Sequence, residues 1–147
     1  MKTDWNKRFV DLSIFISKWS KDRSTGVGAV IADSNNRILS IGYNGFPSGC
    51  DDEDETKHQR PAKYLYTEHA ERNAIYSAAR NGISLNGSII YLSWFPCADC
   101  ARAIIQSGIT KMVCIKPDIN DKTFGESFIA AQKMFEEVGM IIEYIDL

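Results

Sequence analysis

Two short segments of the chain carry side chains that could bind a metal ion and move protons. The first is His69-Ala70-Glu71, and the second is Pro96-Cys97-Ala98-Asp99-Cys100. Two thiolates and one imidazole make three soft ligands. Three protein ligands plus water is the pattern of a catalytic zinc site, whereas structural sites usually close with four. The segments therefore predict one zinc ion held by His69, Cys97 and Cys100.

Glu71 distinguishes a hydrolytic site from a structural zinc knuckle. Bound zinc lowers the pKa of water towards neutrality and so supplies hydroxide. A carboxylate is then needed to carry the released proton to the leaving group, and a structural knuckle has no use for one. Residues two apart on an ideal helix point in different directions, so we expect His69 at the very start of its helix. Glu71 is predicted to be the catalytic proton shuttle.

Each segment taken alone also allows a simpler interpretation. A single Cys-x-x-Cys is often redox-active or structural, and a single histidine is more often a core or surface residue. We favour the joint site because each segment opens a predicted helix, and one predicted strand lies between them. Free N–H groups at a helix start favour the thiolate forms of Cys97 and Cys100. Cys114, inside a predicted strand, is interpreted as a buried structural thiol.

The elements that position these segments follow from apolar periodicity and turn residues. Helices are expected over 5–19, 68–81, 97–107 and 124–138, with Asp4 before the first and Gly82, Gly108 and Gly139 ending the others. Strands are expected over 27–32, 37–43, 88–93, 109–116 and 140–145, the first two as a hairpin. Residues 44–60 are expected to form a long surface loop with little regular structure. This order predicts a mixed five-stranded sheet with helices on both faces, in one domain over 1–147.

Composition excludes several classes of protein. The 147 residues are 44% hydrophobic, which is typical of a globular chain and not of a disordered one. There are 17 Lys and Arg against 19 Asp and Glu, so the basic excess of a dedicated nucleic-acid binder is missing. Four cysteines are too few for a disulfide scaffold. No secretory signal and no apolar run of about 18 residues is visible. We expect a cytoplasmic protein without a membrane span.

The two segments match the His-x-Glu and Pro-Cys-x-x-Cys signature of zinc-dependent nucleobase deaminases. From about Trp5 to Lys116 the chain resembles the cytidine deaminase superfamily, and more closely the deoxycytidylate (dCMP) deaminase family. The zinc motif is common to the superfamily, and the segment 42–45, Gly-Tyr-Asn-Gly, is the more specific pointer to dCMP. The other similar segments are 20–30, 46–49, Lys63-Tyr64 and 100–109. The resemblance implies the three-layer α/β/α fold of cytidine deaminases.

The resemblance also implies roles for single residues. It implies zinc on His69, Cys97 and Cys100, with Glu71 as proton shuttle, and a backbone N–H near Ala70 that holds the pyrimidine O2. It implies that Asn44 hydrogen-bonds the sugar hydroxyl; a plain turn asparagine is the alternative. The walls of the base pocket would be Val27, Ala29, Trp94, Phe95 and Pro96. Trp94 and Phe95 are equally well explained as core aromatics.

A 5′-phosphate needs cations, and arginine matches its geometry best. Lys21 and Arg23 lie at the mouth of the first strand, and Lys63 precedes the catalytic helix. Many relatives carry proline at the position of Arg23, so the resemblance implies no role for it. Each of these cations can also be read as a solvated surface charge.

Further properties vary among members of this family. Some bind a second, structural zinc near the position of Cys50. Here only His58 and Cys114 remain as spare soft ligands, so we do not expect a complete second site. Some members are switched by dCTP and dTTP, with Mg²⁺ accompanying the nucleotide. Relatives assemble as dimers or hexamers, so a homo-oligomer is expected.

The leading hypothesis is hydrolysis of dCMP to dUMP and ammonia, which supplies dUMP for thymidylate synthesis. In it, zinc-bound hydroxide attacks C4 of cytosine while Glu71 protonates N3 and the departing amine. Alternatives are a deaminase for cytidine, deoxycytidine, a modified dCMP or tRNA adenosine. A non-catalytic, zinc-stabilised scaffold is a different class of alternative, and the presence of Glu71 argues against it.

Overall fold

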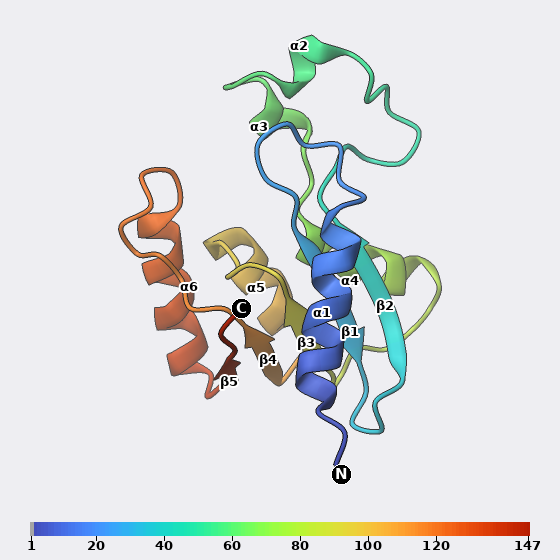
Figure 1. The fold of residues 1–147 in the computed structure, drawn as a ribbon, viewed down its shortest axis with the longest axis vertical. Coiled ribbons are helices and arrows are strands. Elements are labelled where there is room, and N and C mark those ends of the chain that lie inside the picture. Colours follow the sequence, from blue (N-terminus) through green and yellow to red (C-terminus); the bar gives the residue numbers. More distant parts are fainter. Residues whose placement is uncertain (1) are drawn as a thin grey trace.

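A computed structural model describes residues 2–147 as a twisted five-stranded sheet between two layers of helices (Figure 1). The strands are β1 (Gly28–Ala32), β2 (Ile38–Tyr43), β3 (Ile89–Leu92), β4 (Lys111–Cys114) and β5 (Ile141–Tyr144). Their spatial order is β2-β1-β3-β4-β5. β1 is antiparallel to both β2 and β3, whereas β3, β4 and β5 are mutually parallel. The predicted mixed sheet with helices on both faces is confirmed.

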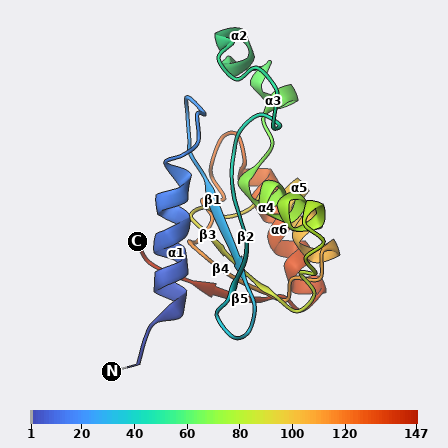
Figure 2. The same cartoon turned by 90° about the vertical axis from the view of Figure 1, so that its right-hand side faces the viewer.

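One face of the sheet is covered by α1 (Trp5–Ser17) alone, as the edge-on view of Figure 2 shows. The side chain of Asp4 caps this helix by accepting the backbone N–H of Lys7 at 3.0 Å. Phe9, Val10 and Ile16 are buried against β1 and β3. The predicted apolar stripe continues to Trp19, but the helix ends at Ser17 and the side chain of Trp19 is half exposed.

The opposite face carries α4 (Ala70–Arg80), α5 (Ala98–Gln106) and α6 (Gly125–Glu137). α4 lies on the hairpin, and α5 and α6 connect the parallel strands. Gly42 permits this packing, because a Cβ atom there would lie 2.4 Å from the carbonyl oxygen of Ala70. On α6, Phe128 and Phe135 are buried as predicted, but Val138 lies beyond the helix end and is 54% exposed.

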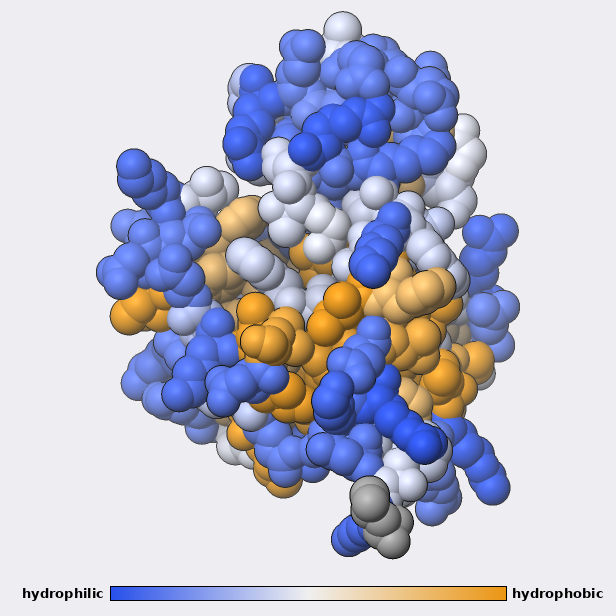
Figure 3. Space-filling view, viewed as in Figure 1, coloured by the Kyte–Doolittle hydropathy of each residue, from blue (hydrophilic) through white to orange (hydrophobic). Residues whose placement is uncertain are grey.

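The region between β2 and α4 contains more helix than the sequence predicted. Within it lie α2 (Glu55–His58) and α3 (Lys63–Tyr66), each only four residues long. Such short helices leave no periodic signal, so the expectation of little regular structure over 44–60 missed α2. Both project beyond one end of the sheet, and the space-filling view shows that this end is hydrophilic while apolar side chains gather lower down (Figure 3). None of the helices in residues 2–147 is long and apolar enough to cross a bilayer.

Candidate metal centre and cavity

The starts of α4 and α5 bring the three proposed ligands together. His69 and Cys97 are the residues immediately before the two helices, and Cys100 lies in the first turn of α5. The Nδ1 atom of His69 is 3.4 Å from the sulfur of Cys97 and 3.4 Å from that of Cys100. Zinc–sulfur and zinc–nitrogen bonds at a tetrahedral angle put such atoms about 3.5 Å apart. The three side chains therefore have the spacing that a tetrahedral zinc ion requires.

The two thiols differ in how readily they ionise. The pKa of Cys97 is lowered to about 4, chiefly because the Cys100 thiol hydrogen-bonds its sulfur, with a further contribution from His69. The pKa of Cys100 is raised, because it is the partner of that thiolate and is deeply buried. We expected both thiolates to be favoured, and this holds for Cys97 alone. A bound cation between the sulfurs is what would stabilise the second thiolate.

Glu71 lies in the first turn of α4 and is only 4% exposed. Burial raises the pKa of its carboxyl group. The backbone of His69 is extended, with φ −79° and ψ 155°, so it stands outside the helix. Its side chain therefore does not follow the helical direction that would point it away from Glu71. The geometry at His69 is the one expected from the sequence, and it places a protonatable carboxyl beside the proposed ligands.

A cavity of about 500 Å³ opens from this group towards α3 and the loop over residues 22–25. Three of the five residues nominated as walls of the base pocket line it, namely Val27, Trp94 and Phe95. Asn44, nominated for the sugar, and Ala70, nominated for the pyrimidine O2, line it as well. Two others do not line it. Ala29 is buried within β1, where its methyl group packs into the core, and Pro96 is buried behind the turn. Phe95 also packs edge-to-face on Phe128, so it is both a core residue and a wall of the cavity.

Asn44 is almost fully buried, and its amide supports the backbone at the cavity. Its Oδ1 accepts the N–H of Val27 at 2.8 Å, and its Nδ2 donates to the carbonyl of Thr25 at 2.9 Å. An amide nitrogen has a second hydrogen, so the side chain can hold the loop and still donate to a ligand. Contact with a sugar hydroxyl stays a prediction.

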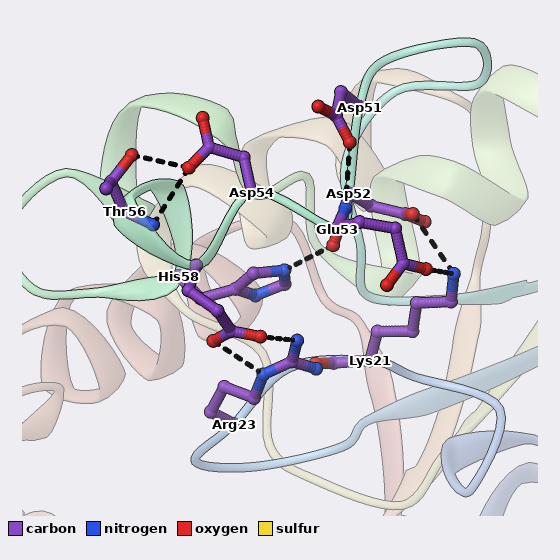
Figure 4. A network of polar contacts seen from close by, with 9 residues as sticks. Lys21, Arg23, Asp51, Asp52, Glu53, Asp54, Thr56 and His58 are labelled. Carbon is purple, nitrogen blue, oxygen red and sulfur yellow. Dashed lines mark hydrogen bonds and ion pairs between the residues drawn. The ribbon is translucent and has the colours of Figure 1, made fainter.

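Two of the three cations nominated for phosphate binding do not line this cavity. Figure 4 shows Lys21 and Arg23 in a network with the acidic segment 51–55. The Nζ of Lys21 lies 3.0 Å from Asp52 and 3.1 Å from Glu53, and the guanidinium of Arg23 pairs with both carboxylate oxygens of Glu55. Lys63 does line the cavity, although its Nζ is 3.1 Å from a carboxylate oxygen of Asp22.

Sequence reasoning missed the far wall of the cavity. This wall comes from the start of α6 and the loop before it. The ring of Phe124 meets that of His69 edge-on at 6.4 Å, and the hydroxyl of Ser127 accepts the N–H of Ala98 at 2.7 Å. The apolar spacing predicted the helix, but no local pattern could show that its start faces residues about fifty positions earlier. The other lining residues that were not nominated are Asp22, Ser24, Thr25, Arg60, Tyr64, Thr67, Arg72, Asp99, Asp121, Thr123 and Phe128.

The remaining cysteines lie apart from the metal centre. Cys114 is fully buried in β4, and burial raises the pKa of its thiol to about 12. The interpretation as a buried thiol is confirmed. Cys50 is exposed, and it lines a separate cavity of about 190 Å³ together with His58. The ring of His58 stacks on Phe46, and its Nε2 lies 2.7 Å from the carbonyl oxygen of Asp52.

Comparison with known proteins gives consistent results. Residues 3–116 match the family model of the cytidine and deoxycytidylate deaminase zinc-binding region. The chain is 42% identical to an uncharacterized deaminase in the luxG 3′ region of Aliivibrio fischeri, over 100% of this chain and 97% of that protein. It is 34% identical to human deoxycytidylate deaminase, over 93% of this chain and 77% of that protein. The crystal structure of dCMP deaminase from cyanophage S-TIM5 in complex with dCMP and dUMP is 27% identical, with a TM-score of 0.75 and 99% of both chains covered.

Proposed function

Because this chain belongs to the cytidine and deoxycytidylate deaminase family, we propose that it hydrolyses dCMP to dUMP and ammonia. The observation that carries the proposal is the group of His69, Cys97 and Cys100 with the buried Glu71 at one end of a nucleotide-sized cavity. A related dCMP deaminase of nearly the same length, crystallised with dCMP and dUMP, supports the choice of substrate. The product would supply dUMP for thymidylate synthesis.

His69 and the two cysteines are the residues that would hold zinc, because their spacing and donor atoms suit that ion. Zinc held there would supply an acidified water, the nucleophile that attack on C4 of the cytosine requires. Glu71 performs the proton transfers. Its carboxylate would accept one proton from the attacking water and pass it to N3. It would then accept the remaining proton of the new C4 hydroxyl and deliver it to the amino nitrogen, which leaves as ammonia while the C4 carbonyl forms. A buried carboxyl with a raised pKa suits both the accepting and the donating role.

The other residues of the cavity orient the substrate and exclude water. The N–H groups in the first turn of α4 have no partner within the helix, so the backbone at Ala70 can donate to the pyrimidine O2. Val27, Trp94 and Phe95 provide apolar surface for the base. The second Nδ2 hydrogen of Asn44 is proposed to donate to the sugar.

The test of the mechanism is Glu71→Gln, which keeps the shape of the side chain and removes its proton transfer. We expect turnover of dCMP to fall by about 10²- to 10⁴-fold, with zinc content and thermal unfolding unchanged. Glu137→Gln makes the same chemical change at the exposed end of α6 and should keep full activity. A zinc-loaded Glu71→Gln protein with normal turnover would contradict the mechanism.

A substrate panel tests the choice of dCMP. Ammonia release would be compared for dCMP, CMP, deoxycytidine, 5-methyl-dCMP and a tRNA, with and without dCTP and Mg²⁺. Turnover restricted to dCMP supports the proposal, whereas faster turnover of another compound in the panel would identify that compound as the substrate. Dependence on dCTP would reveal an effector site. Regulation by dCTP or dTTP, a single domain over 1–147, a homo-oligomer and a cytoplasmic location stay predictions.

A further inference from the structure

The 5′-phosphate of a nucleotide must meet positive charge inside the cavity, and few cations are placed to provide it. Within the described residues 2–147, the cations that line the cavity are Arg60, Lys63 and Arg72. Lys21 and Arg23, two of the three cations nominated from the sequence, face the acidic segment instead, as Figure 4 shows. The candidates for phosphate binding are therefore the residues around α3, and not those at the mouth of β1.

Two of the three lining cations already have carboxylate partners. Arg72 pairs with Glu68 and lies 3.6 Å from Asp99. Lys63 pairs with Asp22, and both side chains are enclosed, at 10% and 7% exposure. In the part of the chain that the structure describes, Arg60 makes no ion pair and no side-chain hydrogen bond. Its guanidinium is the lining cation whose charge is not already balanced.

The position of Arg60 fits the far end of a nucleotide. It lies just before α3, which stands beyond the starts of α4 and α5 in Figures 1 and 2. Thr67 connects α3 to His69, so the cavity runs from the metal ligands along this connection to Arg60. The hydroxyls of Ser24, Thr25 and Tyr64 line the same cavity. A base held at the metal ligands would direct its 5′ substituent towards these groups.

Two of the carboxylates that line the cavity, Asp22 and Asp121, are hydrogen-bonded within their own loops. Asp22 accepts the N–H groups of Ser24 and Thr25 in addition to Lys63. Asp121 accepts the N–H groups of Thr123 and Phe124. Arg60 is therefore the cation lining the α3 end of the cavity that has no ion-pair partner among the described residues, and it can pair with a phosphate.

We propose that Arg60 recognises the 5′-phosphate of the substrate and so makes the enzyme prefer a nucleotide to a nucleoside. This inference rests on the proposed deamination of dCMP. An arginine fork can donate two parallel hydrogen bonds to phosphate oxygens. Lys63, whose charge is paired with Asp22, lines the same cavity.

The experiment compares dCMP with deoxycytidine for zinc-loaded wild-type protein and the variant Arg60→Gln. We expect kcat/KM for dCMP to fall by about 10- to 100-fold in the variant, mainly through KM, since hydrogen bonds between charged groups have this magnitude. Turnover of deoxycytidine should be unchanged. Calorimetry provides a second readout, because the product dUMP should bind about 10- to 100-fold more weakly to the variant while deoxyuridine binds equally well.

Two further variants make the result specific. Arg80→Gln makes the same change at the exposed end of α4 and should leave all constants unchanged. Arg23→Gln tests the residue nominated from the sequence, and a larger loss there than in Arg60→Gln overturns the assignment. An Arg60→Gln protein that handles dCMP normally, or loses dCMP and deoxycytidine equally, also overturns it. Wild-type protein that deaminates neither substrate would overturn the proposed function and this inference together.

Discussion

Asp22 and Lys63 form an ion pair that the sequence pattern did not predict. The residues are 41 positions apart, yet both side chains are nearly enclosed at the edge of the cavity. Removing one partner of a buried ion pair leaves an uncompensated charge, whereas exposed pairs contribute little. Asp22 also accepts two backbone N–H groups of its own loop. This residue therefore holds the cavity wall and balances Lys63 at the same time.

We expect Asp22→Asn to lower the free energy of unfolding by about 3 kcal/mol at pH 7. Asp11→Asn, in an exposed pair with Lys7, should cost under about 1 kcal/mol. Burial alone would raise the pKa of Asp22, but the N–H groups of Ser24 and Thr25 and the charge of Lys63 lower it overall. Because the pKa of this carboxyl group is lower in the folded state, the group stabilises the fold at pH values above its unfolded pKa of about 3.9. This stabilisation is lost as the pH falls through the folded pKa.

Urea unfolding between pH 7 and pH 3 provides the measurement. The gap in stability between wild type and Asp22→Asn should be constant near neutrality and shrink as the solution becomes acidic. A gap that instead widens below pH 4, or is no larger than that of Asp11→Asn at pH 7, would show that the pair is not stabilising.

At the residue scale the sequence was most informative where chemistry constrains residue type. His69, Glu71, Cys97 and Cys100 could be nominated because few other side chains bind zinc or shuttle protons at those spacings. The cations that bind the phosphate could not be predicted as reliably as the zinc ligands, because any exposed Lys or Arg is compatible with a phosphate contact. Whether Arg23 faces a cavity or Glu55 depends on how two loops meet, and no short-range pattern in the sequence encodes that.

At the scale of elements, the site depends on how closely α4 approaches the hairpin. A Cβ atom on Gly42 would lie 2.4 Å from the Ala70 carbonyl and 2.5 Å from the Ala74 nitrogen. Both are backbone atoms of the helix that carries Glu71 in its first turn. Any side chain at Gly42 must therefore push α4 away from β2 and move the site with it.

We expect Gly42→Ala to destabilise the protein by about 1–3 kcal/mol, as overpacking does. Because α4 must shift, kcat should also fall by at least about 10², the cost of a misplacement of about 1 Å. Gly45→Ala is the matched control, because nothing lies within 4 Å of a Cβ atom there and its φ is not positive. Chemical unfolding and dCMP turnover measure the two effects. Full activity in a folded Gly42→Ala protein would show that the site does not depend on this contact.

The elements themselves were largely predictable from the sequence. α1, the hairpin and the alternating strands and helices have apolar periods and glycine stops, and Gly82, Gly108 and Gly139 adopt positive φ where helices were expected to end. α2 and α3 are only four residues long each, too short to show a helical period in the sequence. The packing of the α6 start against His69 is tertiary, and this is why that wall of the cavity was missed.

At the scale of the whole molecule, the metal centre joins the starts of two helices, α4 and α5, that also pack against each other on the sheet. His69 precedes α4, while Cys97 and Cys100 belong to the start of α5, and β3 separates them in sequence. A ligand that binds only the folded state stabilises it by about 2.7 kcal/mol at one hundred times its dissociation constant. For a chain of this size that corresponds to roughly 5–10 °C in Tm. Zinc should therefore act on the stability of the whole fold as well as on catalysis.

We expect removal of zinc by a chelator to lower Tm by about this amount and abolish turnover, and added Zn²⁺ to restore both. Cys97→Ser should copy the metal-free state, with bound zinc falling well below one ion per chain. Cys114→Ala removes a buried thiol outside the site and should keep zinc and activity, at a cost of about 1 kcal/mol. Scanning calorimetry and elemental analysis provide the measurements. If the chelated protein keeps its Tm while losing activity, the metal serves chemistry alone and the sheet fixes α4 and α5 without it.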